Sequence, residues 1–300
     1  MKVKIRKDKR KAMLYLKNSI KMQIELMFQK KGFRIALLIN LVYAALTYLY
    51  HVVTSVEKEI STIVSSHAAF MLLDTAPFYS AYILLMPFLV VLPFAMSFIT
   101  DRSNACLPAL QVRSGVEGYY VSKAVACFVG GVVAFGIPCI INIILNRLTF
   151  PQNGVTFLGN LFDANYVAGI TGVRVMIPTK WSGIWFAKVF VTNPELYNII
   201  IVGIFSVAMG IFGVFVYTVS FLCKRNKIFL FLPLYAILVV LNTLDLFAEK
   251  VNPYTCLVIA DYITGNNMYG KDPMFLYTFF VCMGIVIVAL LTKQSNKDQM

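Results

Sequence analysis

Six stretches without a single charged residue alternate with polar segments along this chain. Each stretch holds 17 to 28 residues, and an α-helix needs about 20 apolar residues to cross a hydrocarbon core of about 30 Å. The pattern therefore predicts an all-α polytopic membrane protein with six transmembrane helices. The expected spans are Ile35–Val53, Tyr79–Ile99, Ala124–Leu145, Leu196–Cys223, Ile228–Leu244 and Phe275–Thr292.

The composition excludes an ordinary soluble protein. Of the 300 residues, 59% are hydrophobic and only 14% are charged, whereas a soluble domain carries about a quarter charged residues. The mean hydropathy is +0.75. A net charge of +13 would suggest a nucleic-acid partner for a soluble protein, but in a membrane protein it reports orientation. No nucleic-acid partner is expected.

The basic residues fall mainly on one side of the expected spans. Twenty of the 27 Lys and Arg lie before the first span, between the second and third, between the fourth and fifth, or after the sixth. Because Lys and Arg stay on the cytoplasmic side, both termini of the 35–292 transmembrane domain are expected inside the cell, with a cytoplasmic tail at 293–300. The expected outer loops are 54–78, 146–195 and 245–274. The expected location is the cell membrane.

Residues 1–34 are expected to form a basic cytoplasmic N-terminus. Apolar residues recur there every three or four positions, which predicts an amphipathic helix over 12–29 that lies along the inner membrane surface. The apolar positions are Met13, Leu16, Ile20, Ile24 and Met27. Two compatible interpretations stay open: a basic anchor on anionic lipid, or an elbow helix that also contacts a cytosolic partner.

The sequence offers no catalytic or metal-binding pattern. It has no phosphate-binding Gly-x-x-x-x-Gly-Lys-Ser/Thr loop and no nucleophile elbow. Its cysteines lack the spacing of a zinc or redox site, and His51 and His67 lie outside any metal motif. No catalytic residue, metal or cofactor is expected in this chain. The spans also lack the ionisable residues that couple transport to protons, which disfavours secondary transport.

The segment between the second and third expected spans resembles a known family. It reads TDRSNACLPALQVRSGVEGYYVSK over residues 100–123. An acidic-basic start, a short apolar stretch, a turn at Arg-Ser-Gly and a closing Tyr-Tyr-Val-Ser-Lys resemble the same segment in membrane (permease) subunits of type-2 ABC exporters. There, an acidic residue opens a short helix and a Tyr/Leu-x-x-x-Lys element closes it. Asp101 stands where that family more often has Glu.

In that family the segment is a cytoplasmic coupling helix, which binds the ATPase and converts nucleotide-driven closure into movement of the spans. The resemblance implies an ATPase-coupling interface with the candidates Asp101, Arg102, Arg113, Gly115, Tyr119 and Lys123. Alternatively, Arg113 and Lys123 only follow the positive-inside rule, and Gly115 only ends a helix. Because this contact is expected to be solvated, reversing the charge of Asp101 alone should be mild and should leave folding intact.

A second candidate region lies between the fifth and sixth expected spans. Residues 253–263 are apolar but too short to cross the bilayer, which fits a re-entrant or interfacial helix. Related permeases place such helices at the outer mouth, so the candidates there are Tyr254, Leu257, Ile259 and Tyr262. The outer loop 146–195 is too long for a simple connector, and is expected either to cover the exit or to recognise cargo.

The resemblance implies the transmembrane subunit of an ATP-driven ABC exporter. Its partners would be membrane lipid, a second copy or a similar permease subunit, and a separate cytosolic ATPase that holds the ATP and magnesium. Uncharged spans favour an amphipathic cargo, either a peptide such as a bacteriocin or lantibiotic, or a lipid. The alternative is a non-transporting membrane sensor or assembly protein whose long outer loop binds a ligand. An intramembrane enzyme ranks third.

Overall fold

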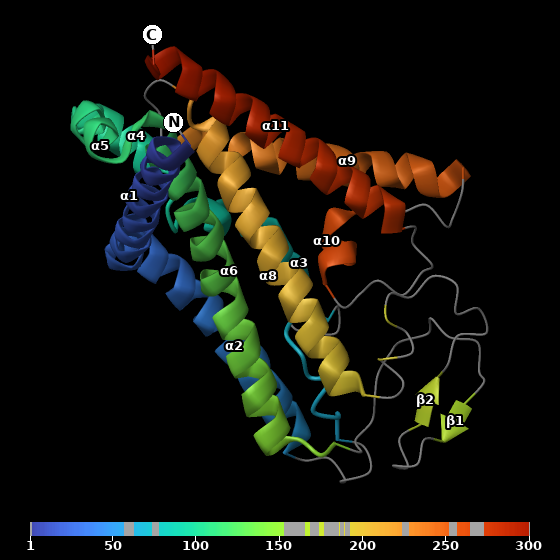
Figure 1. Cartoon of the computed structure of the whole chain (residues 1–300). Helices are drawn as coiled ribbons and strands as arrows, with labels where there is room; N and C mark the ends of the chain where they lie inside the picture. Colours follow the sequence, from blue (N-terminus) through green and yellow to red (C-terminus); the bar gives the residue numbers. More distant parts are fainter. Residues whose placement is uncertain are drawn as a thin grey trace.

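A computed structural model of the chain shows a helical protein with one short strand pair (Figure 1). The structure describes residues 2–56, 63–73, 78–152, 166–168, 174–176, 186, 189, 193–223, 228–251, 257–264 and 273–299. The helices are α1 (Lys2–Gln29), α2 (Lys31–Ser55), α3 (Tyr79–Val91), α4 (Ser97–Ser103), α5 (Leu107–Ser114), α6 (Val116–Thr149), α8 (Pro194–Val219), the 3-10 turn η3 (Ile228–Leu230), α9 (Leu232–Val251), α10 (Ile259–Ile263) and α11 (Pro273–Gln299). Strands β1 (Tyr166–Ala168) and β2 (Arg174–Met176) pair antiparallel, with Val167 opposite Val175.

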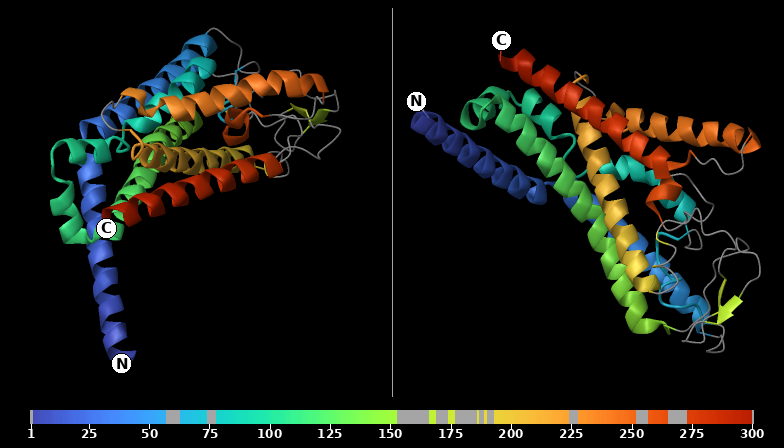
Figure 2. Two further views of the ribbon diagram at one scale, coloured as in Figure 1. Left: turned by 90° about the horizontal axis from the view of Figure 1, so that it is seen from above. Right: turned by 45° about the vertical axis from the view of Figure 1, so that its right-hand side comes forward.

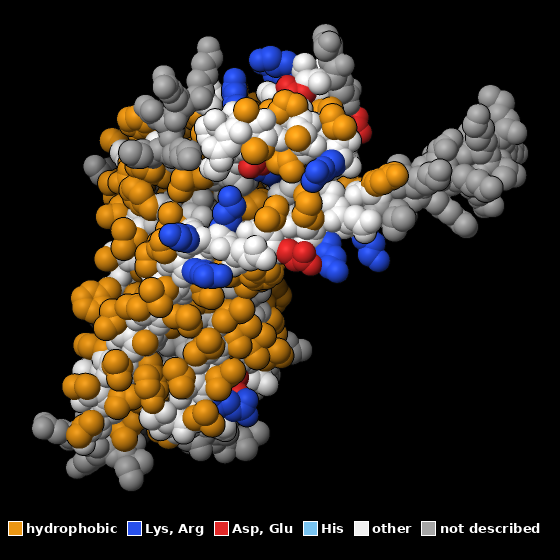
Figure 3. Space-filling view, turned by 90° about the vertical axis from the view of Figure 1, so that its left-hand side faces the viewer, with side chains coloured by type: hydrophobic (Ala, Val, Ile, Leu, Met, Phe, Trp, Pro, Cys, Tyr) orange, Lys and Arg blue, Asp and Glu red, His pale blue; other side chains and the backbone are white. Residues whose placement is uncertain are grey.

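Four described helices are long and apolar enough to cross a membrane: α2, α6, α8 and α11. They coincide with the first, third, fourth and sixth expected spans and indicate a membrane protein. On the face that Figure 3 shows, most Lys and Arg side chains lie in one half of the molecule, and a broad hydrophobic surface covers much of the other half. The second and fifth expected spans contain shorter apolar helices, α3 and the first part of α9 (Leu232–Phe247).

The second expected span is not one continuous helix. α3 ends at Val91, turns occupy residues 92–96, and α4 begins at Ser97. Pro93 lies in these turns, and proline lacks the backbone N–H that a helix interior needs and clashes with the carbonyl four residues earlier. The apolar run of the sequence therefore continues through a break in the backbone.

The closest helix packing joins α6 to α8. A Cβ atom on Gly131 would lie 2.6 Å from the carbonyl oxygen of Met209, and one on Gly210 would lie 2.7 Å from the ring of Phe128. Small residues at such contacts let helix backbones approach closely, which favours association in lipid. On the other side, α1 and α2 cover α6 (Figure 1).

The helix α1 is longer than the expected 12–29 helix and packs on α6. Gln23 and Met27 are buried, and the hydroxyl of Ser19 donates a hydrogen bond of 2.9 Å to the hydroxyl of Ser122. This part of the α1 surface therefore contacts protein rather than lipid.

Part of the first expected outer loop is folded into the bundle. Residues 68–73 are each 8% exposed or less, although their backbone is not helical. The Asn142 side-chain oxygen accepts from the backbone N–H of Met71 at 3.1 Å, and the Asn146 amide donates to the carbonyl of Ala69 at 2.8 Å. The Asn198 amide donates to the carbonyl of His67 at 3.0 Å. These bonds supply the partners that buried non-helical backbone requires.

The remaining apolar helices are less enclosed. In the most hydrophobic 18-residue window of each helix, 61% of the residues are buried in α8 but only 11% are buried in α11. α9 and α11 run at an angle to α6 and α8 and diverge from them (Figures 1 and 2). Their apolar surfaces are therefore available to lipid or to another subunit.

Candidate functional site

The segment predicted as a coupling helix folds into α4, α5 and the first turns of α6. We call the end of the bundle where these elements lie the α5 end; the C-terminus of α11 lies beside them there (Figure 1). α5 begins with proline at its first turn, where a missing N–H costs nothing. It ends at Gly115, whose φ of 72° favours glycine. None of the eight residues of α5 is buried: Leu107 and Leu110 pack partly against the core, and the opposite face of the helix, with Val112 and Arg113, is exposed.

Three of the six predicted coupling residues contact one another. The Lys123 ammonium forms an ion pair with the Asp101 carboxylate, and the Tyr119 hydroxyl donates to the same carboxylate oxygen at 2.8 Å. The Lys123 nitrogen also lies 4.9 Å from the centre of the Tyr119 ring, within the range of a cation–π contact. We call Asp101, Tyr119 and Lys123 the Asp101 clamp; it joins α4 to α6.

The clamp is mostly inside the protein. The side chain of Lys123 is 1% exposed and that of Asp101 is 19% exposed, and Tyr119 is fully buried. A charge taken out of water needs a partner close by. The main role of this ion pair is therefore to hold two helices together rather than to present charge to a partner.

A second polar cluster connects the C-terminal helix to the same end. The Tyr120 hydroxyl donates to the Asp298 carboxylate. The Gln111 amide donates to that carboxylate at 2.8 Å, and the Gln294 amide donates to it at 3.0 Å. This Asp298 cluster links the last turn of α11 to α5 and α6. Sequence reasoning missed it because Tyr120 and Asp298 are 178 positions apart.

The other three coupling candidates are exposed. Arg102, Arg113 and Gly115 lie at the surface of α4, α5 and the turn after α5. The six residues therefore do not form one docking surface: three face outward and three stabilise the elements that carry them. This changes one expectation. Replacement of Asp101 would remove the partner of a buried lysine, so it would not be mild.

A groove lies next to α5, between α1, α5 and α6. Its volume is about 1020 Å³. Arg113 and Glu117 stand in its wall together with apolar side chains. The full lining is Tyr15, Leu16, Val112, Arg113, Ser114, Gly115, Val116, Glu117, Gly118 and Val121.

The second candidate region is packed against the bundle. α10 contacts α8 and α9; Ile259 and Tyr262 are buried in it, and Leu257 is half-buried just before it. The Tyr262 ring lies 5.8 Å from that of Phe275 in α11. Tyr254 lies outside the described residues. The three described candidates thus come together around one short helix.

Comparison with known proteins identifies no relative: no protein-family model, no curated protein and no solved structure matches the chain. Among the described residues, no group of three or more His, Cys, Asp or Glu is placed to hold a metal ion. Function is therefore inferred from the geometry of the α5 end.

Proposed function

We propose that this chain is the transmembrane subunit of an ATP-driven exporter of the type-2 ABC class, and that a separate cytosolic ATPase docks on α5. The observation that supports this most is the exposed α5 helix, held between two helices that the Asp101 clamp joins. A partner that pushes on α5 would move α4 and α6 together, because the Asp101–Lys123 ion pair joins them. The Asp298 cluster would pass the same displacement to α11.

The finer membrane arrangement belongs to the same proposal. Six spans would result if α3 with α4, and α9, also cross the bilayer, and both termini would then lie in the cytoplasm. The weakly enclosed α11 and its neighbour α9 offer apolar surface for a second copy or a similar permease subunit. The cargo would be amphipathic, a peptide or a lipid, since the expected spans carry no charge. ATP and magnesium would bind the ATPase.

The test is co-purification of this chain with a co-expressed cytosolic ABC ATPase from the same genome. The test variant reverses the charge of the two exposed arginines on α4 and α5, Arg102→Glu with Arg113→Glu. This variant should no longer co-purify with the ATPase and should no longer stimulate its ATP hydrolysis. Two charges are reversed together because a single ion pair at a surface contributes only about 0 to 1 kcal/mol to binding. The purified chain alone should hydrolyse no ATP.

The matched control reverses two basic residues away from α5, Lys31→Glu with Arg34→Glu, both exposed on α2. This pair changes the net charge equally and should leave binding intact. If the α5 variant binds and stimulates the ATPase as well as the parent does, α5 is an ordinary connection and the exporter proposal fails.

A further inference from the structure

The chain changes direction where α1 ends and α2 begins (Figures 1 and 2). We call this turn, residues 28–34, the α1–α2 corner. The rings of Phe28 and Phe33 pack edge to face across it, with their centres 5.1 Å apart. A Cβ atom on Gly32 would lie 2.2 Å from the carbonyl oxygen of Leu92, in the turns between α3 and α4. The backbone of the corner is therefore packed closely against the bundle, which fixes the positions from which its side chains project.

Three basic residues of the corner, Lys30, Lys31 and Arg34, are exposed. Among the residues that the structure describes, none of these three side chains forms an ion pair. Glu25 is the acidic residue nearest to them in the sequence, and its carboxylate pairs with Lys21 at 3.9 Å. Three positive charges within five positions therefore have no counter-charge from the described part of this chain.

The exposed side of α2 continues the corner as an apolar surface. Its large exposed apolar side chains over the first leaflet's depth are Ile35, Leu38, Ile39, Val42 and Leu46. Residues three or four positions apart share one face of a helix, so Lys31 and Arg34 lie on the same face as Leu38. From Ile35 to Leu46 the helix rises about 16 Å, which is close to half of a hydrocarbon core of about 30 Å. The corner therefore combines charge at one end with apolar surface over the thickness of one leaflet.

This combination identifies the chemistry of the partner. A soluble anion would meet the charges but would leave the apolar side of α2 uncovered. An uncharged lipid would cover α2 but would leave the three cations without a counter-charge. A phospholipid with a negatively charged head group satisfies both, and clusters of Lys and Arg beside a transmembrane helix are typical sites for such head groups.

We propose that the α1–α2 corner binds one anionic phospholipid. Its phosphate lies beside Lys30, Lys31 and Arg34, and one acyl chain lies along α2 from Ile35 to Leu46. This site is distinct from an anchor along residues 12–29, since it begins where that helix ends. Binding needs only the corner and α2, so it depends neither on the exporter role nor on an ATPase.

The experiment uses the full purified chain in an uncharged detergent, without any ATPase. Phosphatidylglycerol is titrated in, and the lipids retained on the intact protein are counted by native mass spectrometry. Phosphatidylcholine with the same acyl chains is the comparison. One phosphatidylglycerol should be retained at a concentration about tenfold or more below the concentration that phosphatidylcholine needs. Equal retention of the two lipids would overturn the proposal.

A charge variant tests the head-group contact. Lys30→Gln with Lys31→Gln and Arg34→Gln should weaken phosphatidylglycerol binding on the order of a hundredfold and leave phosphatidylcholine binding unchanged. The matched control, Lys17→Gln with Lys293→Gln and Lys297→Gln, also removes three exposed charges and should bind as the parent does. If the corner variant binds as the parent does, or if the control loses as much, these charges serve only the orientation of the chain. If the corner variant instead dissociates a dimer and retains the lipid, a second copy covers this face and the proposal is wrong.

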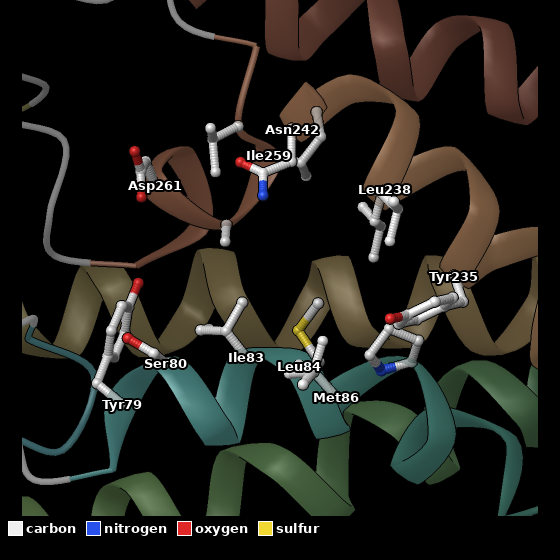
Figure 4. Close-up of a pocket in the computed structure, with 14 residues that line it drawn as sticks. Tyr79, Ser80, Ile83, Leu84, Met86, Tyr235, Leu238, Asn242, Ile259 and Asp261 are labelled. Carbon is white, nitrogen blue, oxygen red and sulfur yellow. The ribbon is translucent and has the colours of Figure 1, made fainter. Parts of the chain in front are cut away.

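A photoreactive lipid locates the acyl chain. In phosphatidylcholine vesicles, a trace of phosphatidylglycerol with a diazirine in the middle of one acyl chain should label α2 between Ile35 and Leu46, and unlabelled phosphatidylglycerol should compete. A cavity of about 280 Å³ between α3, α9 and α10 offers another place for an acyl chain (Figure 4). Its wall combines apolar side chains such as Leu84 and Leu238 with the polar Asn242. Labelling mainly in that cavity, rather than on α2, would overturn the assigned site.

Discussion

The buried Lys123 is the residue on which the α5 end depends most. Its side chain is 1% exposed, and its ammonium shares the Asp101 carboxylate with the Tyr119 hydroxyl. Removing one partner of such a pair costs more free energy than removing both, because the remaining charge stays buried without compensation. The stabilisation therefore belongs to the pair and not to either side chain alone.

This asymmetry gives the first prediction. Asp101→Asn should lower the free energy of unfolding by about 3 kcal/mol. Adding Lys123→Met should recover much of that loss, because no charge then remains buried. The measurement is denaturant unfolding in detergent micelles, with the exposed Arg102→Gln as a control that should change stability by less than about 0.5 kcal/mol. A double variant that is less stable than Asp101→Asn would contradict the account.

His67 gives a second prediction, on pH. Burial lowers the pKa of His67 to about 4, whereas an unfolded histidine titrates near 6.5. The folded protein therefore binds fewer protons than the unfolded one between these pH values, and stability should fall on acidification below about pH 6.5 by up to about 3 kcal/mol. Unfolding measured at pH 7 and pH 4.5 should show a smaller acid loss in His67→Gln than in the parent. An identical acid loss would mean that His67 does not carry this dependence.

Among the helices, the contact between α6 and α8 is the most extensive and is expected to contribute most to the stability of the bundle. Gly131→Ala should destabilise the protein by about 2 kcal/mol, because the added methyl group would meet the backbone of Met209 and force the helices apart. Gly203→Ala on α8 is the matched control, since a Cβ atom there has nothing within 4 Å; the better helix propensity of alanine should leave stability equal or slightly higher. Thermal unfolding followed by circular dichroism compares the two. Equal effects would show that the close approach is unimportant.

Four long helices were predictable because an uncharged run of sufficient length leaves few alternatives in a bilayer. The fifth expected span, at 17 residues, is short for a crossing, so an extension past Asp245 could be expected from its length; α9 does continue to Val251. The second expected span differs for a local reason. Residues 92–96 form turns around Pro93, and a hydropathy pattern does not report a change of backbone inside an apolar run.

The candidate site was predictable only as a segment. The composition and the order of motifs indicated residues 100–123 as a candidate segment. They did not show that Asp101 and Lys123 form an ion pair, because this contact exists only when α5, which lies between them in the sequence, projects away from α4 and α6. The contact of Tyr120 with Asp298 depends on how α11 packs, and the burial of residues 68–73 depends on asparagines in other helices. Such tertiary contacts leave no periodic trace in a single sequence.

For the whole molecule, the basic end predicts the orientation in the membrane. Cys106 is exposed at the α5 end, and Gln152 is exposed just beyond the opposite end of α6. In a variant without Cys223, Cys256 and Cys282, a membrane-impermeant maleimide should label Gln152→Cys in intact cells and label Cys106 only after permeabilisation. The reverse pattern would show that the charge distribution does not set the topology.

The polar contacts of residues 67–71 also set an order of events during synthesis. The partners of Met71, Ala69 and His67 follow them by 71, 77 and 131 positions. At about 5 to 20 residues per second, on the order of ten seconds pass between the emergence of His67 and that of Asn198. During this interval the peptide groups must stay hydrated outside the hydrocarbon, since they cannot enter it without partners. The ribosome has therefore completed α6 and begun α8 before the centre of this protein can close.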